Sequence, residues 1–116
     1  MSFSAEAALV SWLGTETGIP CYGDVPGDRP DKFLTVERTG GSEGPGIRRP
    51  SIAVQVWGPS KYEASALADE VAELLWSRAV EIPQIRSCTI NSGPYSFPDP
   101  ESYQPRYQIY IDLVTV

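Results

Sequence analysis

One segment near the middle of the chain, residues 51–76, constrains the fold more than any other. Its first part alternates, with Ile52, Val54 and Val56 on one side and different residues between them. This period of two predicts a β-strand with one buried face. The pair Gly58-Pro59 ends the strand, because proline removes a backbone donor from the ladder and glycine lets the chain turn.

An amphipathic helix follows this strand. Ser60 and Glu63 have the spacing of a capping box, in which the Ser60 hydroxyl accepts from the Glu63 amide and the Glu63 side chain reaches back. At about 100° per residue, the apolar side chains fall on one stripe roughly 120° wide; they are Ala64, Leu67, Ala68, Val71, Leu74 and Leu75. The strand and the helix can cover each other's apolar faces, which predicts the core of one small domain.

The size and charge of the chain narrow its possible functions. With 116 residues, one domain is expected. The net charge is −6, and only Arg48-Arg49 resembles the basic patch with which a nucleic-acid binder displaces counterions. The sequence also lacks a signal-peptide pattern, a long apolar run and a basic amphipathic helix. We expect a protein made in a cytoplasm, with Cys21 and Cys88 as reduced packing residues.

The remaining elements complete an α+β pattern. Ser4 caps a first helix that ends near Gly18, and one face of this helix holds Ala5, Ala8, Leu9, Trp12 and Leu13. Further strands are expected at residues 32–38, 85–92 and 106–115, the second of them at a sheet edge, and residues 19–22 form either a short strand or an extended lead-in. We predict a mostly antiparallel sheet of about four to five strands with two helices packed on one face.

Two loops invite a ligand-binding interpretation. Residues 23–31 contain three aspartates, but their spacing differs from that of a calcium loop, so a turn-rich loop is expected. Residues 39–50 place Gly41 and Gly46 at the spacing of a phosphate-binding loop, yet the required Lys-Ser/Thr is absent and a strand follows. We expect a flexible hairpin connection that serves as a contact arm. Arg48 and Arg49 either pair with a neighbouring chain or are solvated.

The sheet face opposite the helices is expected to carry polar and aromatic side chains, a composition enriched at protein interfaces. Its members are Phe33, Thr35, Gln55, Trp57, Gln108 and Tyr110. Trp76 falls behind the apolar stripe of its helix. These aromatic residues form an interface or, alternatively, pack against the proline-rich loops of the same chain.

No catalytic arrangement is recognisable in the sequence. The chain contains no histidine, so schemes based on Ser-His-Asp, Cys-His or histidine-bound metal do not apply. Asp99 and Glu101 are adjacent loop acids, a pairing that occurs often by chance. We therefore expect a non-enzymatic protein without cofactor or metal.

Five segments taken together resemble a known family. They are residues 24–30 (DVPGDRP), 33–41 (FLTVERTGG), 52–57 (IAVQVW), 93–99 (GPYSFPD) and 106–108 (RYQ). In this order and spacing they resemble the small tail terminator, or tail completion, proteins of long-tailed bacteriophages, notably those of actinobacterial hosts. The resemblance covers nearly the whole chain, although each motif is short and none is catalytic.

The resemblance implies a virion structural protein that is assembled in the host cytoplasm. Its subunits form a ring of about six copies. The ring caps the tail tube and joins it to the head-tail connector or neck protein. DNA passes through the ring without sequence-specific binding. Loops and one sheet face make the contacts in such rings. The expected contact residues are Phe33, Arg48, Arg49, Trp57, Trp76, Tyr95, Phe97, Arg106 and Tyr110, and the expected lumen-facing acids are Glu63, Asp69, Glu70 and Glu73.

Two other functions fit the same residues. One is a head-side neck or connector protein, which differs from a terminator in its partner. The other is a small non-enzymatic binding module that holds a ligand under the loop containing Tyr95 and Phe97.

Overall fold

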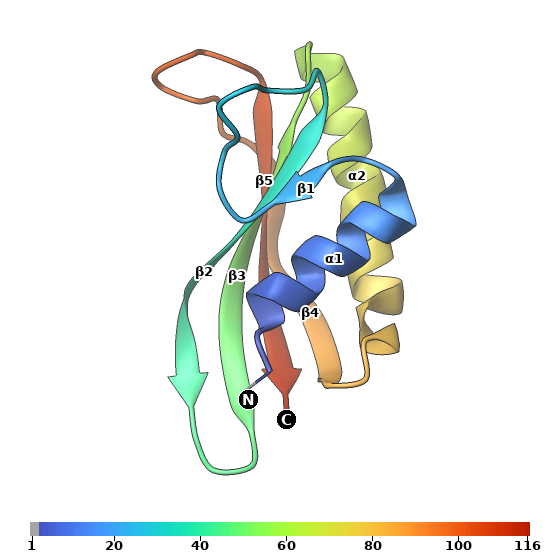
Figure 1. The fold of residues 1–116 in the computed structure, drawn as a ribbon, viewed down its shortest axis with the longest axis vertical. Coiled ribbons are helices and arrows are strands. Elements are labelled where there is room, and N and C mark those ends of the chain that lie inside the picture. Colours follow the sequence, from blue (N-terminus) through green and yellow to red (C-terminus); the bar gives the residue numbers. More distant parts are fainter. Residues whose placement is uncertain (1–2) are drawn as a thin grey trace.

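The computed structural model of the protein describes residues 3–116 and has two layers, a sheet and a pair of helices (Figure 1). The elements in chain order are α1 (Ala5–Thr17), β1 (Cys21–Tyr22), β2 (Phe33–Glu43), β3 (Arg48–Trp57), α2 (Lys61–Arg78), the short 3-10 helix η1 (Ala79–Glu81), β4 (Ile85–Ser96) and β5 (Arg106–Thr115). The sheet order is β1-β2-β3-β5-β4. Only the β1–β2 pair is parallel. The predicted α+β fold is confirmed.

The connection from β3 to α2 forms as the sequence predicts. The Ser60 hydroxyl accepts from the Glu63 amide at 3.1 Å and donates to the Glu63 carboxylate, also at 3.1 Å. The Glu63 side chain thus returns to the Ser60 hydroxyl. A Cβ on Gly58 would lie 3.0 Å from the Ala64 nitrogen, so the absence of a side chain at Gly58 permits the close approach of strand and helix.

Both helices cover the same face of the sheet. Leu9 and Leu13 of α1 and Val71 and Leu75 of α2 are buried against aliphatic residues of the central strands. The strand contribution comes from Leu34, Val36, Ile52, Val54, Val56, Ile109, Ile111 and Leu113. Trp12, expected in the core, packs partly buried at its margin. This apolar layer is the main hydrophobic contribution to stability.

The first helix is capped at both ends and holds the edge of the sheet. The Ser4 hydroxyl accepts from the Ala7 amide at 3.1 Å, and Gly18 closes the helix in the left-handed conformation. The Glu6 carboxylate accepts the backbone N–H of Arg38 in β2 at 2.6 Å. This bond satisfies an outward-facing donor on an edge that β1 leaves uncovered.

The segment expected to be a flexible connection is instead an ordered β-hairpin. Ladder pairing continues from Gly40↔Ser51 to Glu43↔Arg48, so only residues 44–47 form the turn. We call residues 40–51 the arm; it projects beyond the helices at the lower end of Figure 1. Gly41 has a φ of +103° and faces the β3 backbone so closely that a Cβ would clash. The glycines that favoured a loop thus allow the strands to pair tightly.

The last two strands confirm one prediction and extend another. β5 matches the predicted boundaries, and β4 lies at the sheet edge as expected. However, β4 continues to Ser96 and its pairing with β5 shifts register at three places. Such bulges interrupt an edge and disfavour the addition of another strand there.

Both cysteines are free thiols, partly buried beside the core. No helix among the described residues is long and apolar enough to cross a membrane.

Candidate interaction surfaces

The sheet face opposite the helices carries a continuous row of side-chain hydrogen bonds. Thr35 on β2 donates to Gln55 on β3 at 3.1 Å, and Gln55 donates to Gln108 on β5 at 2.9 Å. Gln108 in turn donates to the Tyr95 hydroxyl on β4. The row joins four strands and fixes the orientation of each amide group.

A second polar row crosses the same face nearer the arm. Asp112 accepts from the Ser51 hydroxyl and from the Asn91 amide, both at 2.8 Å. Between the rows, the Thr39 hydroxyl lies 3.1 Å from the Tyr110 hydroxyl. We call this surface, from Thr35 to Asp112 across the four longer strands, the open face. Its polar groups largely satisfy one another, so the surface is ordered before any partner arrives.

One end of the open face is covered by two loops of the same chain, residues 23–31 and 97–105. Beneath them, Phe33 and Trp57 stack with ring centroids 5.0 Å apart. Phe33 is 0% and Trp57 1% exposed. The Trp57 ring N–H donates to Thr35 at 3.1 Å, which links this apolar cluster to the first polar row.

Two arginines complete the cover over Trp57. The guanidinium carbon of Arg106 lies 4.8 Å from the Trp57 ring centroid and 4.7 Å from that of Phe97, while that of Arg29 lies 5.2 Å from Trp57. These are cation–π distances. Burial lowers the pKa of Arg106, which nonetheless stays charged because arginine starts far above neutrality.

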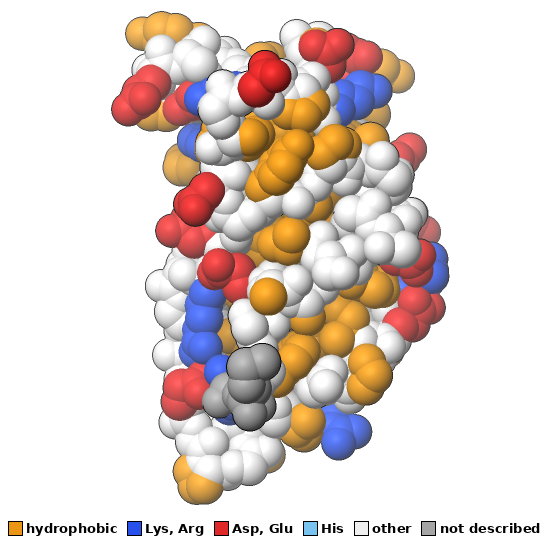
Figure 2. All heavy atoms as spheres, in the orientation of Figure 1, with side chains coloured by type: hydrophobic (Ala, Val, Ile, Leu, Met, Phe, Trp, Pro, Cys, Tyr) orange, Lys and Arg blue, Asp and Glu red, His pale blue; other side chains and the backbone are white. Residues whose placement is uncertain are grey.

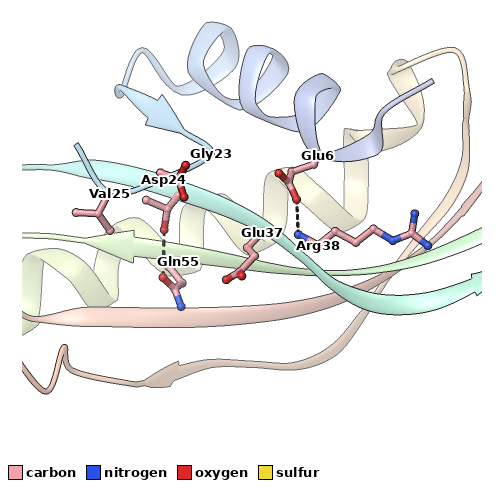
Figure 3. A pocket seen from close by; sticks show the side chains of 8 residues that line it. Glu6, Gly23, Asp24, Val25, Glu37, Arg38 and Gln55 are labelled. Carbon is pink, nitrogen blue, oxygen red and sulfur yellow. Dashed lines mark hydrogen bonds between the residues drawn. The ribbon is translucent and has the colours of Figure 1, made fainter. Parts of the chain in front are cut away.

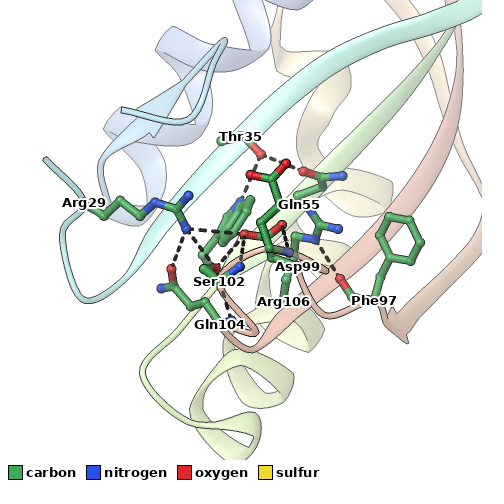
Figure 4. Close-up of polar contacts among 10 residues, drawn as sticks. Arg29, Thr35, Gln55, Phe97, Asp99, Ser102, Gln104 and Arg106 are labelled. Carbon is green, nitrogen blue, oxygen red and sulfur yellow. Dashed lines mark hydrogen bonds and ion pairs between the residues drawn. The ribbon is translucent and has the colours of Figure 1, made fainter. Parts of the chain in front are cut away.

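Arg29 also joins the two loops directly (Figure 4). It donates to Ser102 at 3.2 Å and to Gln104 at 3.1 Å, and it lies 3.7 Å from the Asp99 carboxylate. The Ser102 hydroxyl donates to Asp99, and this bond is the main reason that the pKa of Asp99 falls below its ordinary value. Asp99, considered above as a catalytic acid, is therefore a loop-ordering residue.

The predicted aromatic surface is consequently wrong for Phe33 and Trp57. The alternative, packing within the same chain, holds for both. Arg29 and Arg106 bring the loops over Trp57, and Phe33 packs against Tyr22 and Trp57. Tyr95 and Phe97 remain exposed and meet edge to face at 6.1 Å. Together with the partly buried Tyr110 they line a shallow hollow of about 390 Å³ on the open face.

A polar pocket of about 350 Å³ lies between the start of α1, the first loop and β2 (Figure 3). Glu6, Asp24 and Glu37 contribute carboxylates to its lining, and Glu6 is bonded to the Arg38 backbone. Among residues 3–116, no group of three or more acidic or cysteine side chains is placed to hold a metal ion. The pocket therefore offers acidic and amide groups but no assembled coordination site.

The two adjacent arginines of the arm differ in their surroundings. Arg48 donates to Glu43 at 2.7 Å and to the Phe3 carbonyl at 2.8 Å. Glu43 also accepts from Arg38 at 2.8 Å, and these two arginines lower its pKa, Arg38 contributing most. The guanidinium of Arg48 is therefore already paired with groups of its own chain. Arg49 is exposed and makes no ion pair with any residue in the described range.

The acids of α2, expected to face a lumen, also differ from one another. Glu63 caps its own helix and lies 3.7 Å from Lys32. Asp69, Glu70 and Glu73 are exposed, and none forms an ion pair within residues 3–116. Trp76, 61% exposed, lies on the same helix, as its position behind the apolar stripe predicts.

The structure thus divides the expected contact residues among separate places. Trp57, Phe33, Phe97 and Arg106 meet at the loop-covered end, with Tyr95 beside them. The arm arginines and Trp76 lie elsewhere. Sequence reasoning missed Arg29, whose hydrogen-bond partners Ser102 and Gln104 lie more than seventy positions along the chain; the local sequence holds no signal for these bonds.

Neither the protein-family models nor the curated protein sequences include a match to this chain.

Proposed function

We propose that this protein is a structural subunit of a long-tailed bacteriophage, which forms a ring at the end of the tail tube and joins it to the neck. The observation that carries the proposal is the open face. Four strands present a broad, ordered surface that both helices leave uncovered, with Tyr95, Phe97 and Tyr110 on it. Rigid aromatic side chains among satisfied polar groups are typical of protein interfaces.

The form of the molecule supports ring assembly. The arm, the helix-covered side and the open face are different surfaces of one chain (Figure 1). A contact between unlike surfaces repeats from copy to copy and closes into a ring when the rotation allows. The net charge of −6 fits a ring whose channel lets DNA pass without holding it.

Ligand binding under the Tyr95–Phe97 segment is less well supported. The hollow there includes Gln55 and Gln108, but their amide groups are already paired along the polar row. A ligand would have to replace these bonds, whereas a protein surface can pack over them. A neck protein on the head side would use the same open face and differ in its partner.

The test is binding to tube ends. Tubes polymerised from purified tail tube protein of an actinobacterial phage are mixed with this chain and imaged by electron cryomicroscopy. Ring-shaped density at one tube end is expected. Tyr95→Ser combined with Tyr110→Ser should remove it, whereas the matched pair Tyr62→Ser and Tyr103→Ser, both sites 81% exposed elsewhere, should not. Bare tube ends with the unaltered chain would refute the proposal.

A further inference from the structure

The tip of the arm carries an exposed apolar side chain and a charged side chain that forms no ion pair within residues 3–116. Ile47 is 49% exposed, and Arg49 follows two positions later. Ile47 is the last residue of the turn and Arg49 belongs to β3, so both lie at the end of the hairpin. The Arg38–Glu43–Arg48 bonds hold this hairpin at 2.8 and 2.7 Å, so the tip presents both groups in a fixed arrangement.

A groove of matching chemistry runs between the end of α1 and the middle of α2. Its volume is about 380 Å³, and its apolar lining consists of Ile19, Leu67, Val71 and Leu74. A second hollow of about 260 Å³ continues along α2 and shares Glu70 and Leu74 with the first. Figure 2 shows hydrophobic atoms on this side of the molecule, with acidic and basic side chains along the edge formed by α2.

The rim of the groove and of the adjoining hollow carries more acidic than basic side chains. Glu16 is paired with Arg78, and the lining residue Lys32 lies 3.7 Å from Glu63. By contrast, Glu70 of the groove and Glu73 of the adjoining hollow have no ion-pair partner among residues 3–116. Three positions apart on a helix, they lie about 5–6 Å from each other. A partner segment that carries one cation next to one apolar side chain could therefore contact these carboxylates and the apolar lining at the same time.

We propose that this groove receives the arm of a second copy of the chain, with Ile47 over Leu67 and Leu74 and Arg49 between Glu70 and Glu73. The proposal rests on the proposed function, because it names the surfaces that join neighbouring subunits of the ring. The chain's own arm projects beyond the helices at the lower end of Figure 1 and is held there by its ladder and ion pairs. Arm and groove are unlike surfaces, so their contact is heterologous and can close a ring.

The decisive experiment is a charge exchange between two variants, with self-association measured by native mass spectrometry and sedimentation velocity. Arg49→Glu places like charges at every contact, and Glu70→Arg does the same from the other side. Each variant alone should associate at least about tenfold more weakly than the unaltered chain, since like charges at an interface cost several kcal/mol. In an equal mixture, alternating copies restore opposite charges at every contact, so assembly should return.

Matched controls separate this effect from a general change in charge. Asp69→Arg changes the neighbouring acid on α2, which does not line the groove, and Arg86→Glu reverses an exposed arginine on β4. Neither should weaken association, and thermal melts should show all four variants folded. Ile47→Asp should weaken association like Arg49→Glu, whereas Val80→Asp, at a site 52% exposed, should not.

Three outcomes would overturn the proposal. Rings that form unchanged from both charge-reversed variants would refute the arm–groove contact while leaving the ring intact. Loss in each variant without recovery in the mixture would mean that the two sites do not meet. An unaltered chain that stays monomeric at about 1 mM, well above the range of stable assemblies, would also refute it, and tube-end binding would then decide the ring function separately.

Discussion

The two faces of the sheet are made by the same strands but are stabilised in different ways. On the helix-covered face, aliphatic side chains such as Val54 and Ile109 are completely buried and contribute through the hydrophobic effect. On the open face, their sequence neighbours Gln55 and Gln108 form a hydrogen-bonded row. The difference teaches that alternation along a strand separates two tasks: one face holds the fold together, and the other presents an ordered surface.

The loop-covered end of the open face breaks this division, because Trp57 is buried there. Trp57→Ala should lower the free energy of unfolding by about 3–5 kcal/mol, as large-to-small changes at buried aromatic sites do. Trp76→Ala is the matched control: its side chain is 61% exposed, so a change within about 0.5 kcal/mol is expected. Urea unfolding followed by circular dichroism measures both. Equal effects would mean that the loops do not cover Trp57 in solution.

The comparison of the faces is sharpened by two neighbouring residues of β5. Ile109→Ala opens a cavity under the helices and should cost about 2–5 kcal/mol. Gln108→Ala removes the hydrogen bonds to Gln55 and Tyr95 on the open face and should cost about 1–2 kcal/mol. The same urea titration compares them. A larger loss at Gln108 would show that the polar row, and not the apolar layer, holds the strands.

Binding to tail tube ends should reverse this order. Because Gln108 is on the open face, the surface proposed to meet the tube, and Ile109 is not, Gln108→Ala should weaken binding to tube ends by roughly threefold to tenfold while the milder variant Ile109→Val should leave it unchanged. Co-sedimentation with polymerised tubes at several concentrations gives the two dissociation constants. If Ile109→Val weakened tube binding as much as Gln108→Ala, the separation of tasks between the faces would be wrong.

The smallest effects concern the thiols at the margin of the core. Burial raises the pKa of Cys21 from 9.0 to about 11 and that of Cys88 from 9.0 to about 12. At pH 8 the thiolate of Cys21 should therefore be about 100-fold scarcer than in the unfolded chain. Iodoacetamide labelling followed by mass spectrometry should be correspondingly slow until urea is added. Rapid labelling of the folded chain would contradict this.

The same shifts determine how these thiols affect stability at high pH. The neutral thiol is favoured in the folded state, so its contribution is complete below pH 9 and is lost as pH rises through about 11 for Cys21 and about 12 for Cys88. Melting temperatures should fall over this range, and serine at either position should reduce the fall.

Local patterns predicted the elements whose partners are close in sequence. The Ser60 cap, the apolar stripe of α2 and the alternation of β5 depend on period and spacing alone, and all three form as expected. For the arm, the sequence pattern predicts a flexible connection, because glycines such as Gly41 usually mark turns, and this prediction is wrong. Here Gly41 meets the opposite backbone too closely for any side chain, a constraint that exists only once the strands pair.

The candidate surfaces were harder to predict, because burial on the open face depends on distant segments. Alternation correctly placed Trp57 opposite the core side of β3, but nothing near it in sequence shows that Arg29 and Arg106 cover it. Likewise, pairing between Glu43 and Arg48 distinguishes Arg48 from Arg49, although the two arginines look equivalent in the sequence. Long-range contacts decide which candidate residues are free to meet a partner.

The most direct test of the proposed assembly is native mass spectrometry of the unaltered chain over a concentration series, with electron microscopy of the same samples. A closed ring of about six copies that replaces the monomer as concentration rises is the expected result. A chain that remains monomeric throughout, and that also leaves tail tube ends bare, would contradict the assignment of the arm to subunit contacts and of the open face to the tail tube.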